Sequence, residues 1–227
     1  MPVGDCQREF AAAAAADGIV LGRQSFDWLS EQGHFGLLWV ARLSRQADIE
    51  RVDGAVRALE AIYVKLGGNP GVLEAGRQNR LRGDFVHEPS RTLIEIDESQ
   101  HFTSFRLATL DLYPHEAPLG FDLEEYRRLC RRWRGKSDNY RRTKEARGFG
   151  VGGRQRQRAY YDALRDLATP AMGHPPLVRI DATHGNGKAA YERHRDQLFT
   201  LLGRDGEAGT GGVPQSAGGP WGSNTVP

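Results

Sequence analysis

Three acidic residues and a histidine lie close together in this sequence, in a pattern that could bind a metal ion. Asp84 precedes an expected turn, Glu95 and Asp97 stand two residues apart in an apolar segment, and His101 follows. Side chains alternate between the two faces of a strand, so Glu95 and Asp97 should share one face. Two like charges there are costly unless a cation lies between them, and a divalent metal suits carboxylate oxygens best. The segment therefore predicts a metal site.

The acids are expected on a β-hairpin. Arg80–Val86 and Thr92–Asp97 have the character of extended segments, and His87-Glu88-Pro89-Ser90 between them has that of a turn. We therefore expect the two segments to pair antiparallel. Phe102–Tyr113 keeps an apolar alternation that fits either a further strand or a short helix.

Helices are expected on both sides of this hairpin. Apolar residues at spacings of three and four between Ile49 and Leu66 predict an amphipathic helix, which Ser44 could cap. The other expected elements are a strand at Phe35–Leu43, helices at Phe121–Trp133, Arg154–Ala168 and Lys188–Leu202, and a strand at Leu177–Asp181. This order of elements predicts an α/β fold of three layers, with helices flanking a mixed sheet.

The composition favours one globular domain with extensions. Of 227 residues, 39% are hydrophobic and 26% charged, enough to bury a core. Residues 1–44 are expected to pack on the core as an extension, and residues 45–202 to form the α/β domain, with a basic insertion at about 121–153. Residues 203–227 contain eight glycines and three prolines, which predicts a disordered tail.

Several classes of protein are disfavoured. Only Cys6 and Cys130 occur, without zinc-site spacing, so a disulfide framework is not expected, which fits a reducing cytoplasm. No apolar run approaches the ~20 residues needed to span a bilayer, so no membrane partner is expected. Asp5 and Glu9 stand where a signal peptide carries positive charge, which disfavours that interpretation of the alanine run at 11–16.

One segment is strongly basic although the net charge is only +2. Tyr126–Arg158 contains thirteen Arg or Lys and two acids, which suits a polyanionic partner such as DNA. Trp133 and Tyr140 are available to stack on a flipped or frayed base. The alternative is an ordinary solvated helix face. The residues expected to contact nucleic acid, mainly through phosphate, are Gln100, Arg131, Arg132, Lys136, Arg141, Arg142 and Lys144.

The order of these motifs resembles a known family. Asp84-Phe85-Val86, then Ile94-Glu95-Ile96-Asp97, then His101 resembles the PD-(D/E)XK nuclease superfamily with its restriction-endonuclease-like fold. Within it, the pattern is similar to the very-short-patch-repair endonuclease branch and its uncharacterised relatives. Tyr160–Asp166 and Leu177–Ile180 are similar to the closing helix and strand of that branch. The resemblance covers about 52–202.

The resemblance implies hydrolysis of DNA phosphodiester bonds with Mg²⁺ or Mn²⁺. Asp84 and Glu95 would be the metal ligands, the Ile96 carbonyl a third ligand, and Asp97 a further acid behind them or on a second metal. His101 would act as general acid or base. Two features depart from the family, because Gly83 replaces the proline and Asp97 stands at the usual lysine position. The group that activates water is therefore left open. Glu74 is a further candidate acid.

Other interpretations remain open at this stage. The same fold with a degraded site could bind nucleic acid or a protein partner, and a third alternative is a hydrolase acting on another phosphoester. Glu95 and Asp97 could also be the solvated face of a strand, paired with arginines of the hairpin at positions 80, 82 or 91. In that case His101 would be a structural or surface histidine and Asp84 a turn residue.

Overall fold

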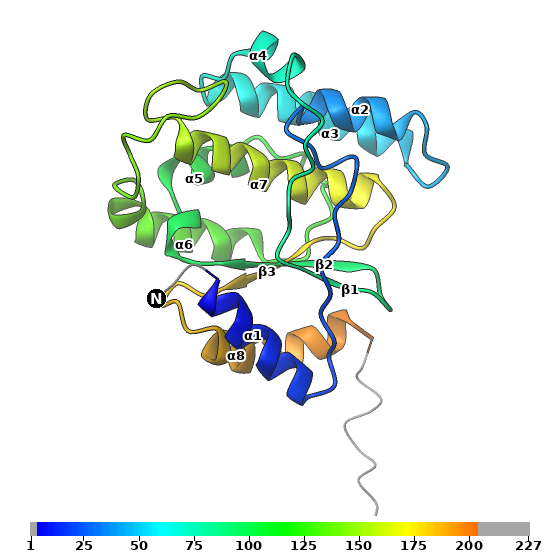
Figure 1. Cartoon of the computed structure of the whole chain (residues 1–227), viewed down its shortest axis with the longest axis vertical. Coiled ribbons are helices and arrows are strands. Elements are labelled where there is room, and N and C mark those ends of the chain that lie inside the picture. Colours follow the sequence, from blue (N-terminus) through cyan, green and yellow to red (C-terminus); the bar gives the residue numbers. More distant parts are fainter. Residues whose placement is uncertain (1–3, 204–227) are drawn as a thin grey trace, which may run out of the picture.

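A small mixed β-sheet lies between two groups of helices in the computed structural model, which describes residues 4–203 (Figure 1). The strands are β1 (Phe85–His87), β2 (Thr92–Asp97) and β3 (Val178–Asp181), in the order β1-β2-β3. β1 pairs antiparallel with β2, and β3 pairs parallel with β2. The predicted antiparallel hairpin and the α/β class, with a mixed sheet flanked by helices, are therefore confirmed.

The two faces of the sheet are covered by different helices (Figure 1). One face is covered by α1 (Asp5–Ala16) and α8 (Gly187–Leu201), which pack against each other. The helices beyond the other face are α2 (His34–Ala41), α3 (Ile49–Lys65), α4 (Pro70–Glu74), α5 (Ser104–Leu110), α6 (Leu123–Ser137) and α7 (Arg154–Ala171). A short 3₁₀ turn, η1 (Ser99–His101), follows the end of β2.

β2 is the central strand, and all six of its residues are buried. Ile94 and Ile96 pack in the core beneath α1 and α8, together with Phe10. Glu95 and Asp97 point to the opposite face, as predicted, but they are only 7% and 0% exposed. The interpretation of these acids as a solvated strand face is therefore wrong, because the strand has helices over both faces.

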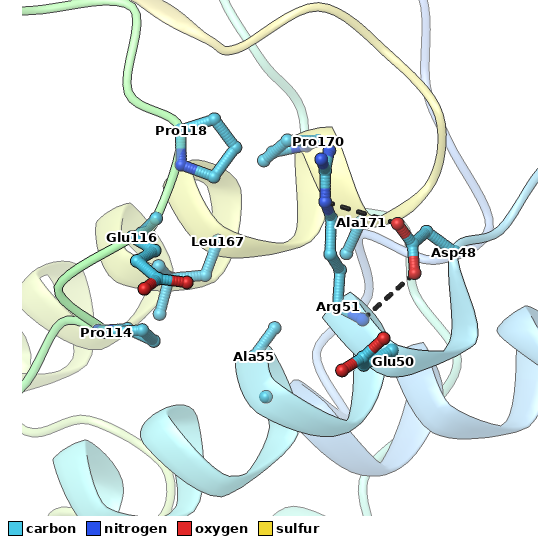
Figure 2. Close-up of a pocket in the computed structure, with 12 residues that line it drawn as sticks. Asp48, Glu50, Arg51, Ala55, Pro114, Glu116, Pro118, Leu167, Pro170 and Ala171 are labelled. Carbon is cyan, nitrogen blue, oxygen red and sulfur yellow. Dashed lines mark hydrogen bonds and ion pairs between the residues drawn. The ribbon is translucent and has the colours of Figure 1, made fainter.

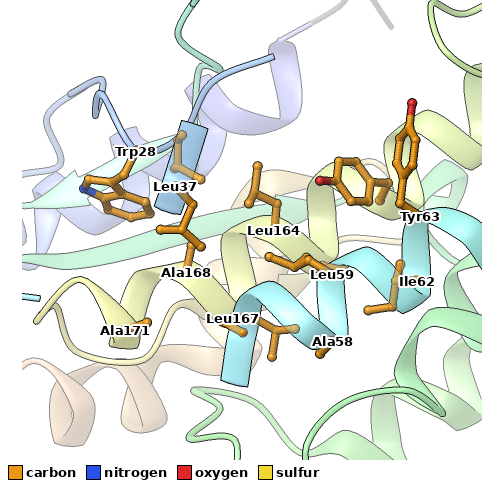
Figure 3. Packing of buried hydrophobic residues seen from close by; sticks show 14 of the residues in the cluster. Trp28, Leu37, Ala58, Leu59, Ile62, Tyr63, Leu164, Leu167, Ala168 and Ala171 are labelled. Atoms are coloured by element: carbon orange, nitrogen blue, oxygen red, sulfur yellow. The ribbon is translucent and has the colours of Figure 1, made fainter. Parts of the chain in front are cut away.

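The largest core joins α3 to α7 and fixes the orientation of α7 (Figure 3). Leu59, Ile62 and Tyr63 of α3 pack toward Leu164 and Leu167 of α7. Residues at spacings of three and four on α7 form this contact, so other positions of the helix are left to face the sheet. The polar residues that complete the candidate site come from those positions.

Two predictions near the amino terminus are wrong. Phe35–Leu43 is not a strand, since α2 occupies His34–Ala41. A short, almost wholly apolar run fits a buried helix as well as a buried strand, so periodicity cannot separate them. Ser44 does not cap α3, because the helix begins later, and the side chain of Asp48 accepts the N–H of Arg51 instead.

Other elements differ in extent from their predicted ranges. Phe102–Tyr113 contains a helix, α5, capped by Thr103, and only the end of the expected segment Arg80–Val86 joins the sheet. α6 continues to Ser137, so the start of the basic segment is helical. Helix α1 was not predicted, and it lies so close to α8 that a Cβ on Gly187 would meet the Cys6 carbonyl oxygen at 1.8 Å. The tail predicted as disordered lies outside the described residues after Gly203.

Candidate functional site

Asp84 and Glu95 lie side by side at the start of the hairpin, each held by the backbone of the other strand. Asp84 Oδ2 accepts the N–H of Ile96 at 2.9 Å, and Glu95 Oε1 accepts the N–H of Asp84 at 3.2 Å. A Cβ on Gly83 would lie 3.0 Å from Glu95 Oε1, so a small residue suits that position. Each carboxylate is thus fixed through one oxygen, and neither of the other two oxygens has a protein hydrogen bond within residues 4–203.

The two acids open onto a pocket of about 420 Å³ between the sheet and α7. The pocket is lined by acidic, basic and neutral side chains in an almost wholly polar wall. They are Gln7, Glu31, Leu81, Arg82, Asp84, Glu95, His101, Arg154, Gln157, Arg158, Tyr161, Asp162 and Arg165. Four carboxylates and four guanidinium groups meet here, so side chains of both charges line the pocket.

Burial sets the protonation of the two acids. It raises the pKa of Glu95 to about 7, although the Arg165 guanidinium partly offsets the rise. Burial also raises the pKa of Asp84, and the hydrogen bond from the Ile96 N–H acts in the opposite direction. Both carboxylates would gain from a nearby cation, because desolvation disfavours their charged forms.

His101 forms a close pair with Asp162 at the edge of the pocket. Its Nδ1 lies 3.1 Å from Asp162 Oδ2 and 3.3 Å from Asp97 Oδ1. Burial alone would lower the pKa of His101, but the two carboxylates outweigh it and raise that pKa above its usual value. Burial alone would raise the pKa of Asp162, which His101 and neighbouring arginines instead hold far below its usual range. With Nδ1 engaged, Nε2 is the nitrogen that can serve the pocket.

Arg165 places a fixed positive charge between the acids. Its Nε lies 3.4 Å from Glu95 Oε1, and its Nη1 lies 3.7 Å from Asp162 Oδ1. The guanidinium also donates to the backbone carbonyls of Tyr161 at 3.2 Å and Arg82 at 2.9 Å. These carbonyl contacts fix the group in the pocket wall, so it can stabilise negative charge without moving.

Asp97 does not reach the pocket. Both of its oxygens accept from Arg179 Nη1, at 3.0 and 2.9 Å, and Tyr126 donates its hydroxyl to Oδ2 at 2.6 Å. Arg179 also donates to Asp166 Oδ1 at 2.7 Å, and its side chain is 1% exposed. The Asp97 carboxylate is therefore bound within a buried ion network, behind the pocket and against β3.

The remaining predicted site residues do not line the pocket with their side chains. Glu74 is exposed on α4 and does not line the pocket. Ile96 turns its side chain to the opposite core and uses its N–H to hold Asp84. Gln100 donates its side-chain amide to Glu98, in a small hollow beside the site. Across residues 4–203, no group of three or more His, Cys, Asp or Glu side chains converges in a way that could hold a metal ion.

The predicted DNA-contacting cations are exposed and carry uncompensated charge. Arg127 and Arg128, in contrast, pair with acids of the same helix. In the described chain, none of the predicted cations forms an ion pair with an acid; they are Arg131, Arg132, Lys136, Arg141, Arg142 and Lys144. Exposed cations of this kind fit an ordinary solvated face as well as a surface that binds an anion.

The α7 residues that line the pocket were not among the site residues predicted from the sequence. Arg154, Arg158, Asp162 and Arg165 recur at spacings of four, four and three, which places them along one face of a helix. That spacing predicts a stripe of charged side chains along one face of the helix. Its relation to Asp84 depends on the packing of α7 over the sheet, which no local pattern contains.

A second hollow of about 430 Å³ lies far from these acids along the chain, between the start of α3 and the end of α7 (Figure 2). Its wall includes Pro114, Pro118 and Pro170, and its Asp48 and Arg51 are paired with each other. None of the predicted site residues lines it. We therefore place the candidate site at the Asp84 and Glu95 pocket.

The comparisons with known proteins give one match. Residues 61–146 match the model of a family described as "Family of unknown function (DUF7255)". This region contains β1, β2 and the residues from Asp84 to His101, but not α7 or β3. No curated protein and no solved structure matches the chain. Of the helices within residues 4–203, none is long and apolar enough to cross a membrane.

Proposed function

We propose that this protein is a metal-dependent endonuclease that hydrolyses DNA phosphodiester bonds in the cytoplasm, on a restriction-endonuclease-like core. The observation that carries the proposal is the arrangement of Asp84 and Glu95. Each is anchored through one oxygen, and both open onto a pocket that also holds a histidine and four arginines. A carboxylate pair beside cationic groups suits a metal ion that is shared with a phosphate.

The residues fit Mg²⁺ or Mn²⁺ better than a metal with an all-protein ligand cage. Mg²⁺ is commonly bound by one or two carboxylates, with water and substrate phosphate completing its shell. Asp84 and Glu95 would hold it, whereas Asp97 is assigned to the buried network because Arg179 and Tyr126 engage its oxygens. When bound, such an ion polarises the phosphate and lowers the pKa of a coordinated water.

His101 and Arg165 supply the other functions that hydrolysis needs. The Asp162 and Asp97 carboxylates raise the pKa of His101 and so favour its charged form, from which Nε2 can donate a proton to the leaving oxygen. Asp162 holds this ring through Nδ1. Arg165 provides the positive charge that the family's lysine would supply, and it can neutralise charge on the phosphate.

The second candidate function is a nuclease-fold module that binds nucleic acid without cutting it. One observation favours it, because the four carboxylates of the pocket face four arginines, which can neutralise them without an added ion. Arg165 beside Glu95 would then be a structural ion pair. The cleavage experiment separates the two functions.

The proposal is tested by incubating the purified protein with plasmid and single-stranded DNA in Mg²⁺, Mn²⁺ or EDTA. We expect cleavage with metal and none in EDTA. Asp84→Ala should be inactive, because it removes one of the two metal ligands, whereas Glu74→Ala, on the exposed helix α4, should cut like the wild type. The proposed endonuclease activity is refuted if the wild type cuts no DNA with any metal, or if Asp84→Ala cuts as well as the wild type.

DNA binding through the basic segment is a separate prediction. Replacing Arg131, Arg132, Arg141 and Arg142 with alanine should weaken binding and reduce the slope of log affinity against log salt by up to about four. The reason is that each phosphate contact releases counterions. Fluorescence anisotropy with labelled DNA at several salt concentrations measures the slope. Replacing Arg127 and Arg128, which are already paired with acids, is the matched control, and an unchanged slope in the fourfold variant contradicts the prediction.

A further inference from the structure

A smaller hollow of about 280 Å³ adjoins the candidate site across η1. It is lined by Ser99, Gln100, Lys136, Ser137, Asn139 and Tyr140. Gln100 and His101 are consecutive residues of η1, one in the wall of each pocket. Anything bound in the small hollow therefore lies next to the group that we assign to proton transfer.

Arg158 connects the two hollows. Its side chain lines the site pocket, and its Nη1 donates to the Gln100 carbonyl at 3.2 Å. Its guanidinium group also lies over the Tyr140 ring, with its carbon 6.0 Å from the ring centre, and that of Arg141 lies over the ring at 5.2 Å. An aromatic ring beside two guanidinium groups is an arrangement that binds a base and its phosphate together.

The backbone around Tyr140 is held in place by one buried side chain. Gln155 is 5% exposed, and its Nε2 donates to the carbonyls of Ser137 at 2.9 Å, Asp138 at 2.9 Å and Tyr140 at 2.6 Å. The next residue, Arg141, has φ of +51°, a conformation that non-glycine residues adopt at a cost. Even so, the Tyr140 side chain remains 41% exposed. An exposed ring on a backbone that is held in place is suited to stacking, because little backbone freedom is lost on binding.

We propose that Tyr140 and the hollow beside it form a subsite for one unpaired nucleobase, across η1 from the pocket of Asp84 and Glu95 in which the phosphate to be cut would lie. This inference rests on the proposed function and specifies its substrate as single-stranded DNA, or DNA with an unpaired nucleotide at the cut. Lys136 in the small hollow and Arg158 in the site pocket would neutralise the flanking phosphates. Asn139 and Gln100 donate their amide N–H groups to the Gly135 carbonyl and to Glu98, so their amide oxygens are the groups that can accept from the base edge. A paired base cannot lie flat on Tyr140, since its faces are already stacked in the duplex.

The test uses single-stranded oligonucleotides that contain 2-aminopurine, whose fluorescence is quenched on stacking, in EDTA to prevent cleavage. We expect the wild type to quench the probe and to bind the single strand more tightly than the matching duplex. Tyr140→Ala should remove the quenching and weaken binding about tenfold, while Tyr140→Phe retains both. Trp39→Ala is the control, because Trp39 is an exposed aromatic on α2, outside both pockets.

The outcomes separate this inference from the nuclease itself. Equal quenching by wild type and Tyr140→Ala, or tighter binding of duplex, overturns the subsite even if Asp84-dependent cleavage is found. Quenching that depends on Tyr140 supports the subsite even if the wild type cuts no DNA, in which case the function to abandon is the endonuclease.

Discussion

Glu95→Gln is expected to lose at least about a hundredfold of the metal-dependent cleavage and to be more stable than the wild type above pH 7. The loss of activity follows because a neutral amide oxygen is a weaker ligand for a hard cation than a carboxylate. Even residues that only support a metal ligand typically cost 10–100-fold when replaced, so a ligand should cost more. Supercoiled-plasmid cleavage with Mn²⁺ measures this effect.

The gain in stability follows from the burial of the same carboxyl. The pKa of Glu95 is raised from 4.5 to about 7 in the folded protein. A group with a raised folded pKa contributes stability that is complete below pH 4.5 and is lost as the pH rises through 7. Each unit of pKa difference between the folded and unfolded states corresponds to about 1.4 kcal/mol, so the free energy of unfolding falls by on the order of 3 kcal/mol by pH 8 to 9. Glutamine has no charge to bury, so Glu95→Gln should avoid most of this loss.

Urea unfolding of both proteins at pH 5 and pH 8.5, in EDTA, tests the stability effect. The variant is compared with the wild type because His101, whose pKa is also raised, weakens the fold in the same direction. Glu88→Gln, at an exposed position of the hairpin turn, should follow the wild-type pH dependence. Parallel curves for Glu95→Gln and wild type would show that Glu95 carries no buried charge, and undiminished cleavage would remove it from the metal site.

Local patterns predicted the hairpin and the placement of its acids well. The predicted strand Thr92–Asp97 has the bounds of β2, because its alternation is regular and a turn rich in polar residues precedes it. The approach of Asp84 to Glu95 follows from that hairpin. The strand pattern and the turn lie within about a dozen residues of sequence, and so short a connection between two paired strands makes them antiparallel.

The partners of these acids depend on contacts between distant parts of the chain. Arg179 binds Asp97 across 82 residues of sequence, through the parallel pairing of β2 with β3. Arg165 meets Glu95 only because the α3 core holds α7 against the sheet. No periodicity or motif in a single sequence indicates which residues so far apart along the chain will be in contact. Asp97 could therefore be recognised as an unusual acid but not as the partner of an arginine.

Arg179→Met is expected to lower the free energy of unfolding by about 3–5 kcal/mol, the typical cost of removing one partner from a buried ion pair. Arg179 is 1% exposed at the side chain and holds Asp97 and Asp166 together. Asp166 keeps Arg106 and Tyr113 after the substitution. Asp97 keeps only the Tyr126 hydroxyl and His101, so it becomes the uncompensated buried charge.

A second substitution should rescue the Arg179→Met protein. Adding Asp97→Asn to Arg179→Met should recover part of the lost stability, because a neutral amide leaves no unpaired charge in the core. The surface pair of Arg80 with Asp27 is the control, since both side chains are more than half exposed and Arg80→Met should cost less than about 1 kcal/mol. Urea midpoints at pH 7 compare the four proteins. If Arg179→Met costs no more than Arg80→Met, or if Asp97→Asn restores nothing, Asp97 is not held by Arg179 in solution. It would then be free to join Asp84 and Glu95 as the third acid that the sequence alone suggested.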